Sequence, residues 1–91
     1  MDSITKLRAQ IDIINLDLCR LLVERKKLAE QIGNEKRKNG IEVYDRNREA
    51  NIYTNLKQNF TPDEYTYLEP IFKQIISTSR QVQLNYSNKN N

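Results

Sequence analysis

The 91-residue sequence has no histidine and only one cysteine, Cys19. Without histidine, the chain lacks His-based catalytic triads, His general bases and His-containing metal sites. A single cysteine cannot form an internal disulfide framework, and it fits a reducing cytoplasm. We therefore expect no metal site and place the protein in the cytoplasm.

Turn-forming residues and long apolar runs are also scarce. Two glycines and two prolines are too few for the turns of an all-β fold. No apolar run approaches the length of a membrane span. The first ten residues, "MDSITKLRAQ", lack the basic and apolar regions of a signal peptide. The chain is therefore predicted to be a single all-α domain, residues 1–91, without a membrane partner.

The charge balance favours a small anionic ligand over nucleic acid. Lysine and arginine number 15 against 12 acidic residues, which gives a net charge of +3. Acidic residues are interleaved with the basic ones, so no dedicated nucleic-acid surface is expected.

The first half of the chain reads as one long helix. Apolar residues recur at alternating steps of three and four from Ile4 to Ile32, which is typical of a heptad seam. Asp2 or Ser3 can cap its start and Asn39-Gly40 its end, so we predict a helix over 3–38. This helix is a rod of roughly 50 Å, whereas a compact chain of this length has a radius of gyration of about 12 Å. A partner should cover the rod, and an intertwined antiparallel homodimer is the simplest solution.

Two shorter helices are predicted to follow, over 46–58 and 62–84. Asp45 can cap the first, and Thr61, Pro62 and Glu64 form a capping box at the start of the second. Pro70 should kink this last helix or split off its first turn. Loops are expected near 39–44 and 59–61, and residues 85–91 read as a frayed tail.

Arg25 occupies a position on the heptad seam that an apolar residue would normally fill. A buried guanidinium needs a counter-charge, and no acidic residue of this helix lies on the seam. Arg25 could instead extend to water or pair with Glu49. Lys36 lies three turns later on the same side, roughly 16 Å along the axis, so the two could clasp a small anion. Alternatively, Lys36 is a solvated cation that complements the helix dipole.

Arg8 and the last helix supply further candidates. Arg8 lies about 25 Å before Arg25, so it can reach this site only from the second subunit of an antiparallel dimer. The two-fold axis would then fall near residues 19–21. Ser79 and Gln83 interrupt an apolar face of the last helix, and such polar groups need partners. For Ser79 a hydrogen bond to a backbone carbonyl is the alternative.

Three stretches carry a resemblance to a known family. "LRAQIDIINLDLCRLLVERKKLAEQIGNEKRKNG", "VYDRNREANI" and "IFKQIISTSRQVQ" are similar to the three helices of the all-helical, AroQ-type chorismate mutases. The resemblance covers about residues 4–84. The positions that match the family's functional residues are Arg8, Arg25, Lys36, Asp45, Arg48, Glu49, Ser79 and Gln83.

The resemblance implies an enzyme that rearranges chorismate to prephenate in the shikimate pathway, toward phenylalanine and tyrosine. The reaction is unimolecular and needs no cofactor. Arg25 and the partner subunit's Arg8 would bind the two carboxylates of the substrate, and Lys36 and Gln83 would contact its ether oxygen. Glu49 and nearby backbone would hold the ring hydroxyl.

Other functions remain open at this point. An isochorismate–pyruvate lyase on the same scaffold would use a very similar cationic pocket. The chain could also be a non-catalytic helical module that binds nucleic acid or protein, which strong salt dependence of binding would reveal. A non-covalent complex with another enzyme of the shikimate pathway is a further possibility.

Overall fold

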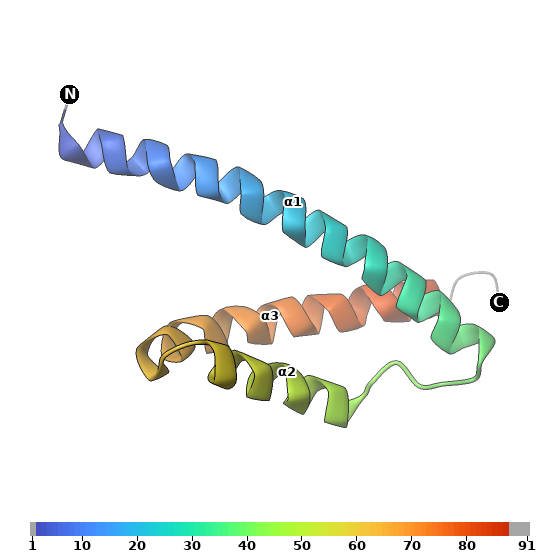
Figure 1. The fold of residues 1–91 in the computed structure, drawn as a ribbon. Coiled ribbons are helices and arrows are strands. Elements are labelled where there is room, and N and C mark those ends of the chain that lie inside the picture. The colour runs from blue at the N-terminus through green and yellow to red at the C-terminus, as the bar shows by residue number, and fades with distance from the viewer. Residues whose placement is uncertain (1, 88–91) are drawn as a thin grey trace.

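The computed structural model describes residues 2–87, which form three α-helices and no strand (Figure 1). They are α1 (Ser3–Lys38), α2 (Arg46–Asn59) and α3 (Pro62–Ser87). The all-helical prediction is confirmed, and α1 has the predicted bounds. The other two helices run slightly further than predicted, since α2 ends at Asn59 and α3 at Ser87. Of the predicted tail, residues 88–91 lie outside the described residues.

Side-chain caps define where each helix begins. Asp2 accepts a hydrogen bond of 2.7 Å from the backbone N–H of Thr5, and Asp45 accepts one of 2.9 Å from Arg48. Thr61 and Glu64 exchange two such bonds, of 2.9 and 3.2 Å, at the start of α3. These carboxylates and the hydroxyl satisfy N–H groups that have no partner inside the helix.

Gly40 turns the chain away from the end of α1. It has a φ of 65°, in the left-handed region that glycine adopts without steric cost. The N–H of Ile41 then donates to the carbonyl of Lys36 over 2.8 Å, and the N–H of Gly40 donates to Arg37 over 3.3 Å. This pattern is a Schellman motif. It sends residues 41–45 back along the molecule toward α2.

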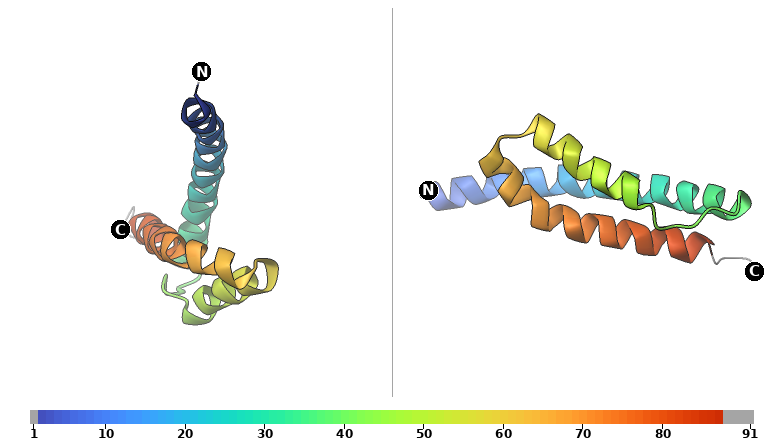
Figure 2. Two further views of the ribbon diagram at one scale, coloured as in Figure 1. Left: turned by 90° about the vertical axis from the view of Figure 1, so that its left-hand side faces the viewer. Right: turned by 90° about the horizontal axis from the view of Figure 1, so that it is seen from below.

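The three helices form a flat, open V rather than a globule. α1 and α3 meet near their C-terminal ends and diverge toward the N-terminus of α1, and α2 runs antiparallel beside α3 (Figures 1 and 2). Within residues 2–87, α1 and α2 make no close backbone contact. The molecule measures 57 × 29 × 15 Å, with a radius of gyration of 16.7 Å. A compact chain of this length would have about 12 Å.

The vertex of the V is a close approach between α1 and α3 at Gly33. A Cβ atom built on Gly33 would lie 2.7 Å from the carbonyl oxygen of Gln83 and 2.9 Å from its Cα. The backbone of α3 therefore occupies the space that any other side chain at position 33 would need. This contact determines where along α1 the helix α3 crosses and how closely the two helices approach.

The apolar core of the single chain is very small. Among the residues that the structure describes, the buried apolar side chains are Ala29, Val43 and Ile76. By contrast, seam residues of α1 such as Ile14 and Leu21 are each 62% exposed. Despite its length α1 carries many charges, and no helix within the described range is apolar enough to cross a membrane. The seam of α1 therefore faces outward along most of its length.

Pro70 does not split α3, which is continuous from Pro62 to Ser87. The ring removes the N–H that would donate to the carbonyl of Thr66, so this turn has one hydrogen bond fewer. The first turns of α3, drawn in gold, run at an angle to the rest in the right-hand view of Figure 2. Of the two predicted effects of Pro70, the splitting was wrong and the bend is what the helix shows.

Substituting Gly33 with alanine tests the close approach. We expect Gly33→Ala to lower the free energy of unfolding by about 1–2 kcal/mol, because overpacking against a backbone outweighs the better helix propensity of alanine. Thermal unfolding followed by circular dichroism, at one fixed protein concentration, measures the change.

Gln31→Ala is the matched control, since Gln31 is an exposed residue of the same helix. It should leave the midpoint of unfolding within about 2 °C of the unmodified protein. Equal midpoints for Gly33→Ala and the unmodified chain would show that α3 does not pack this closely on α1.

Candidate active site

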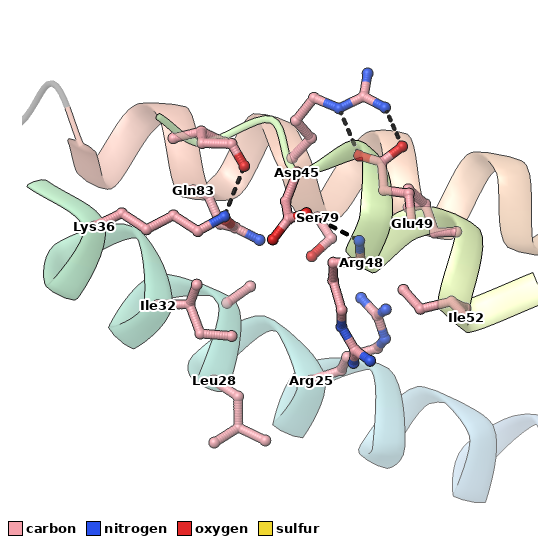
Figure 3. A pocket seen from close by; sticks show the side chains of 14 residues that line it. Arg25, Leu28, Ile32, Lys36, Asp45, Arg48, Glu49, Ile52, Ser79 and Gln83 are labelled. Carbon is pink, nitrogen blue, oxygen red and sulfur yellow. Dashed lines mark hydrogen bonds and ion pairs between the residues drawn. The ribbon is translucent and has the colours of Figure 1, made fainter. Parts of the chain in front are cut away.

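A cavity of about 390 Å³ lies between the three helices and the 41–45 segment (Figure 3). This volume is within the usual range for small-molecule sites. Its lining includes the buried apolar residues Ala29 and Ile76 as well as charged side chains from all three helices. The cavity brings together all the predicted site residues except Arg8, namely Arg25, Lys36, Asp45, Arg48, Glu49, Ser79 and Gln83.

Arg8 lies on the exposed N-terminal half of α1, away from this cavity. Seventeen helical residues, or about 25 Å, separate it from Arg25. The fold of one chain therefore does not bring Arg8 to the other predicted residues.

Arg25 has no counter-charge in the described part of the chain. It is half-buried, and no carboxylate of residues 2–87 forms an ion pair with it. Its guanidinium lies beside that of Arg48 (Figure 3). Burial lowers the pKa of Arg25, and the like charge of Arg48 lowers it further. The alternative of an Arg25–Glu49 pair was wrong, since Glu49 pairs with Arg80 instead.

Lys36 is tied to the 41–45 segment. Its Nζ donates a hydrogen bond of 2.7 Å to the carbonyl oxygen of Val43, whose side chain is buried. An ammonium group has three N–H donors, so two remain for other acceptors. The backbone of Val43 thus holds the ammonium at the cavity wall.

Glu49 is held by a residue that the sequence analysis missed. Arg80 donates to both carboxylate oxygens, from Nη2 to Oε1 over 2.7 Å and from Nε to Oε2 over 3.1 Å (dashed lines at Glu49, Figure 3). The hydrogen bonds to Glu49 raise the pKa of Arg80. The available signal was its place directly after Ser79, which puts it one turn before Gln83 on the same side of α3.

Gln83 and Ser79 bring uncommitted polar groups to the cavity. The Oε1 atom of Gln83 is buried and has no hydrogen-bond partner among residues 2–87. An amide can also turn to offer its NH₂ group in place of its oxygen. Ser79 is half-buried, and its hydroxyl makes no hydrogen bond to another described residue, so the alternative of a backbone bond was wrong. Buried polar groups of this kind need a ligand or water as partner.

The charges around the cavity do not balance. Among residues 2–87, four cations line it against two carboxylates, which leaves two positive charges. One carboxylate, on Asp45, already caps α2, and the other, on Glu49, is bound by Arg80. The cations are Arg25, Lys36, Arg48 and Arg80. The arrangement therefore suits a small ligand that carries two negative charges.

Comparison with known proteins agrees with this chemistry. The family model described as "Chorismate mutase type II" matches residues 7–84, which is most of the chain. The matched segment includes every predicted site residue from Arg8 to Gln83. No curated protein sequence matches the chain.

Replacing Arg25 with methionine should stabilise the protein in the absence of ligand. Arg25→Met removes a partly buried charge that lacks a counter-charge and keeps the aliphatic stem. We expect a gain on the order of 1 kcal/mol, or roughly 5 °C in the midpoint of thermal unfolding.

Arg80→Met is the matched control and should have the opposite sign. It removes the partner of Glu49 and leaves a half-buried carboxylate without its hydrogen bonds. A lower midpoint for both variants would show that Arg25 has a counter-charge in solution.

Proposed function

The chain belongs to the chorismate mutase type II family, and we propose that it rearranges chorismate to prephenate in the cavity between α1, α2 and α3. The single observation that carries the proposal is the set of uncompensated cations around this cavity. As a single domain of residues 1–91 in the cytoplasm, the enzyme would serve phenylalanine and tyrosine biosynthesis.

The chemistry of the substrate fits the groups that line the cavity. Chorismate is a small dicarboxylate with an ether link and a ring hydroxyl. Its rearrangement is unimolecular, so it requires no nucleophile and no proton shuttle. Catalysis then rests on holding a reactive conformer and on stabilising the charge that develops as the ether bond breaks. Fixed donors in a partly dry site supply both.

Two arginines are proposed to bind the two carboxylates. Arg25 would take one, because its guanidinium has no ion-pair partner in the described chain and lies in the cavity wall. Arg8 of the partner subunit would take the other. A guanidinium binds a carboxylate through two parallel hydrogen bonds, which fixes direction as well as position. The flexible side chain of chorismate would thus be held over the ring.

Lys36 and Gln83 are proposed to stabilise the ether oxygen. Val43 holds Nζ of Lys36 in place and leaves two of its N–H groups for the ligand. Gln83 lines the same cavity, and its amide NH₂ group would donate to the ether oxygen, while its buried Oε1 atom has no partner among the described residues. Together they would surround an oxygen that gains negative charge in the transition state, where prearranged donors are most effective.

The remaining residues are proposed to bind the ring side of the substrate. Glu49 would accept a hydrogen bond from the ring hydroxyl, since each of its oxygens can accept more than the one bond from Arg80. Asp45, Arg48 and Ser79 line the same cavity. They would complete the polar contacts around the ring hydroxyl and the nearer carboxylate.

An intertwined antiparallel homodimer is proposed because the single chain exposes too much surface. Its accessible area is 7499 Å², roughly 2,000 Å² more than the 5,500 Å² or so expected for a compact chain of this mass. An excess of this size on each of two chains matches an obligate homodimer interface. The exposed seam of α1 would pair with its copy, and each Arg8 would reach the other subunit's cavity.

Incubation with chorismate tests the function directly. The absorbance of chorismate should decay in the presence of the protein, with prephenate identified as the product. Release of pyruvate from isochorismate instead would assign the lyase reaction on the same scaffold. Absence of turnover of chorismate would contradict the proposed function.

Lys36→Ala should reduce kcat by roughly 10²–10³-fold, as expected for the loss of one fixed donor to a developing oxyanion. Steady-state kinetics on chorismate measures the effect. Lys38→Ala is the matched control, because Lys38 is an exposed cation of the same turn that pairs with Glu35. Near-normal kcat in Lys36→Ala would remove Lys36 from the ether oxygen.

Mixing two inactive variants tests the shared site. Heterodimers of Arg8→Ala and Lys36→Ala chains contain one site in which every residue is native. Refolding an equimolar mixture should therefore restore about a quarter of the unmodified activity. The control mixture of Arg25→Ala with Lys36→Ala should restore no activity. Each site takes both Arg25 and Lys36 from one chain, so every site of the heterodimer keeps one of the two changes. Equal recovery in the two mixtures would contradict a contribution of Arg8 across the interface.

A further inference from the structure

Arg80 lies at the edge of the cavity without a role in the proposed chemistry. It directly follows Ser79 on α3, and its side chain reaches Glu49 on α2. Its side chain is 38% exposed, and that of its partner Glu49 is 22% exposed. The pair therefore lies at the border between the cavity and solvent, where a positioned carboxylate can still face a ligand.

The two hydrogen bonds from Arg80 fix the plane of the Glu49 carboxylate. Nε and Nη2 of one guanidinium edge bind one oxygen each, over 3.1 and 2.7 Å. This paired geometry restricts rotation of the carboxylate far more than a single point contact would. Each oxygen keeps a free lone pair, so the carboxylate can accept a further hydrogen bond in a defined direction.

Packing alone does not hold Glu49 in place. No residue of α2 is buried, and α2 makes no close backbone contact with α1 within the described residues. Arg80 is itself restrained, because its guanidinium carbon lies 5.0 Å from the centre of the Tyr44 ring. Tyr44, Arg80 and Glu49 thus join the 41–45 segment, α3 and α2 in one contact, which we name the Tyr44–Arg80–Glu49 clasp.

We infer that Arg80 is a positioning residue that acts through Glu49 to set recognition of the ring hydroxyl of the substrate. This inference rests on the proposed function and assigns a specificity role to a residue outside the matched set. A carboxylate held in one orientation favours a substrate whose hydroxyl meets its free lone pair. A site built to bond a hydroxyl also rejects analogues that place it elsewhere.

The kinetics of Arg80→Met test the inference. Because the hydroxyl bond is made in both ground state and transition state, we expect KM for chorismate to rise roughly tenfold with kcat within about twofold. Arg80→Lys keeps the charge but not the paired hydrogen bonds, so its KM should lie between those of the unmodified protein and Arg80→Met. Lys73→Ala, an exposed cation of the same helix, is the matched control and should leave both parameters unchanged.

A double variant separates positioning from direct binding. In a Glu49→Gln background, Arg80→Met should add less than about a twofold further change in KM, because the group through which Arg80 acts is already altered. A full tenfold rise in that background would show that Arg80 binds the substrate itself. A loss confined to kcat in Arg80→Met would equally overturn the inference.

A measurement without substrate keeps the test independent of turnover. The Arg80 Nε–H resonance, assigned by its loss in Arg80→Lys, should exchange slowly with solvent in the unmodified protein and rapidly in Glu49→Gln. Rapid exchange in both would show that the clasp does not form, which overturns the inference. If the clasp forms but chorismate is not turned over, the proposed function fails and the positioning of Glu49 stands.

Discussion

The close approach of α3 to α1 at Gly33 is the constraint on which the rest of the structure depends. The backbone of Gln83 occupies the space that a side chain at position 33 would need, so α1 and α3 approach most closely there. The two helices diverge from this point. The divergence opens the cavity on one side and leaves the seam of α1 uncovered further along. Gln83 also lines the cavity, so the contact at Gly33 links the crossing of the two helices to the candidate site.

The helices were predictable from sequence because their signals are local. The caps at Asp45 and Thr61 lie within a few residues of the groups they satisfy, and the heptad seam fixes the length of α1. Arg25, Ser79 and Gln83 could be picked out as candidates because they interrupt an apolar pattern, whereas Asp45, Arg48 and Glu49 became candidates only through the family resemblance. The partners of the charged groups were not predictable, because they depend on the path of the chain in space.

Arg80 and Val43 illustrate that limit. The pairing of Arg80 with Glu49 joins residues 31 positions apart, and no spacing rule connects them. The bond from Lys36 goes to the backbone of Val43, and backbone carbonyls leave no trace in a sequence pattern. Both contacts depend on the path of the chain after α1, which brings the 41–45 segment to Lys36 and α2 to Arg80. As a result, the Glu49 carboxylate and the Lys36 ammonium are both held by groups that the heptad pattern does not predict.

α2 differs from the other two helices in how firmly it is attached. It has no buried residue, and it contacts α3 while staying clear of the backbone of α1 in the described part of the chain. Segments with few buried contacts open locally at a lower free energy than the core. The wall that α2 forms is thus the part of the cavity that opens most readily. Opening of α2 alone would admit the proposed substrate while the crossing of α1 and α3 stays intact, and substrate exchange would then be faster than unfolding.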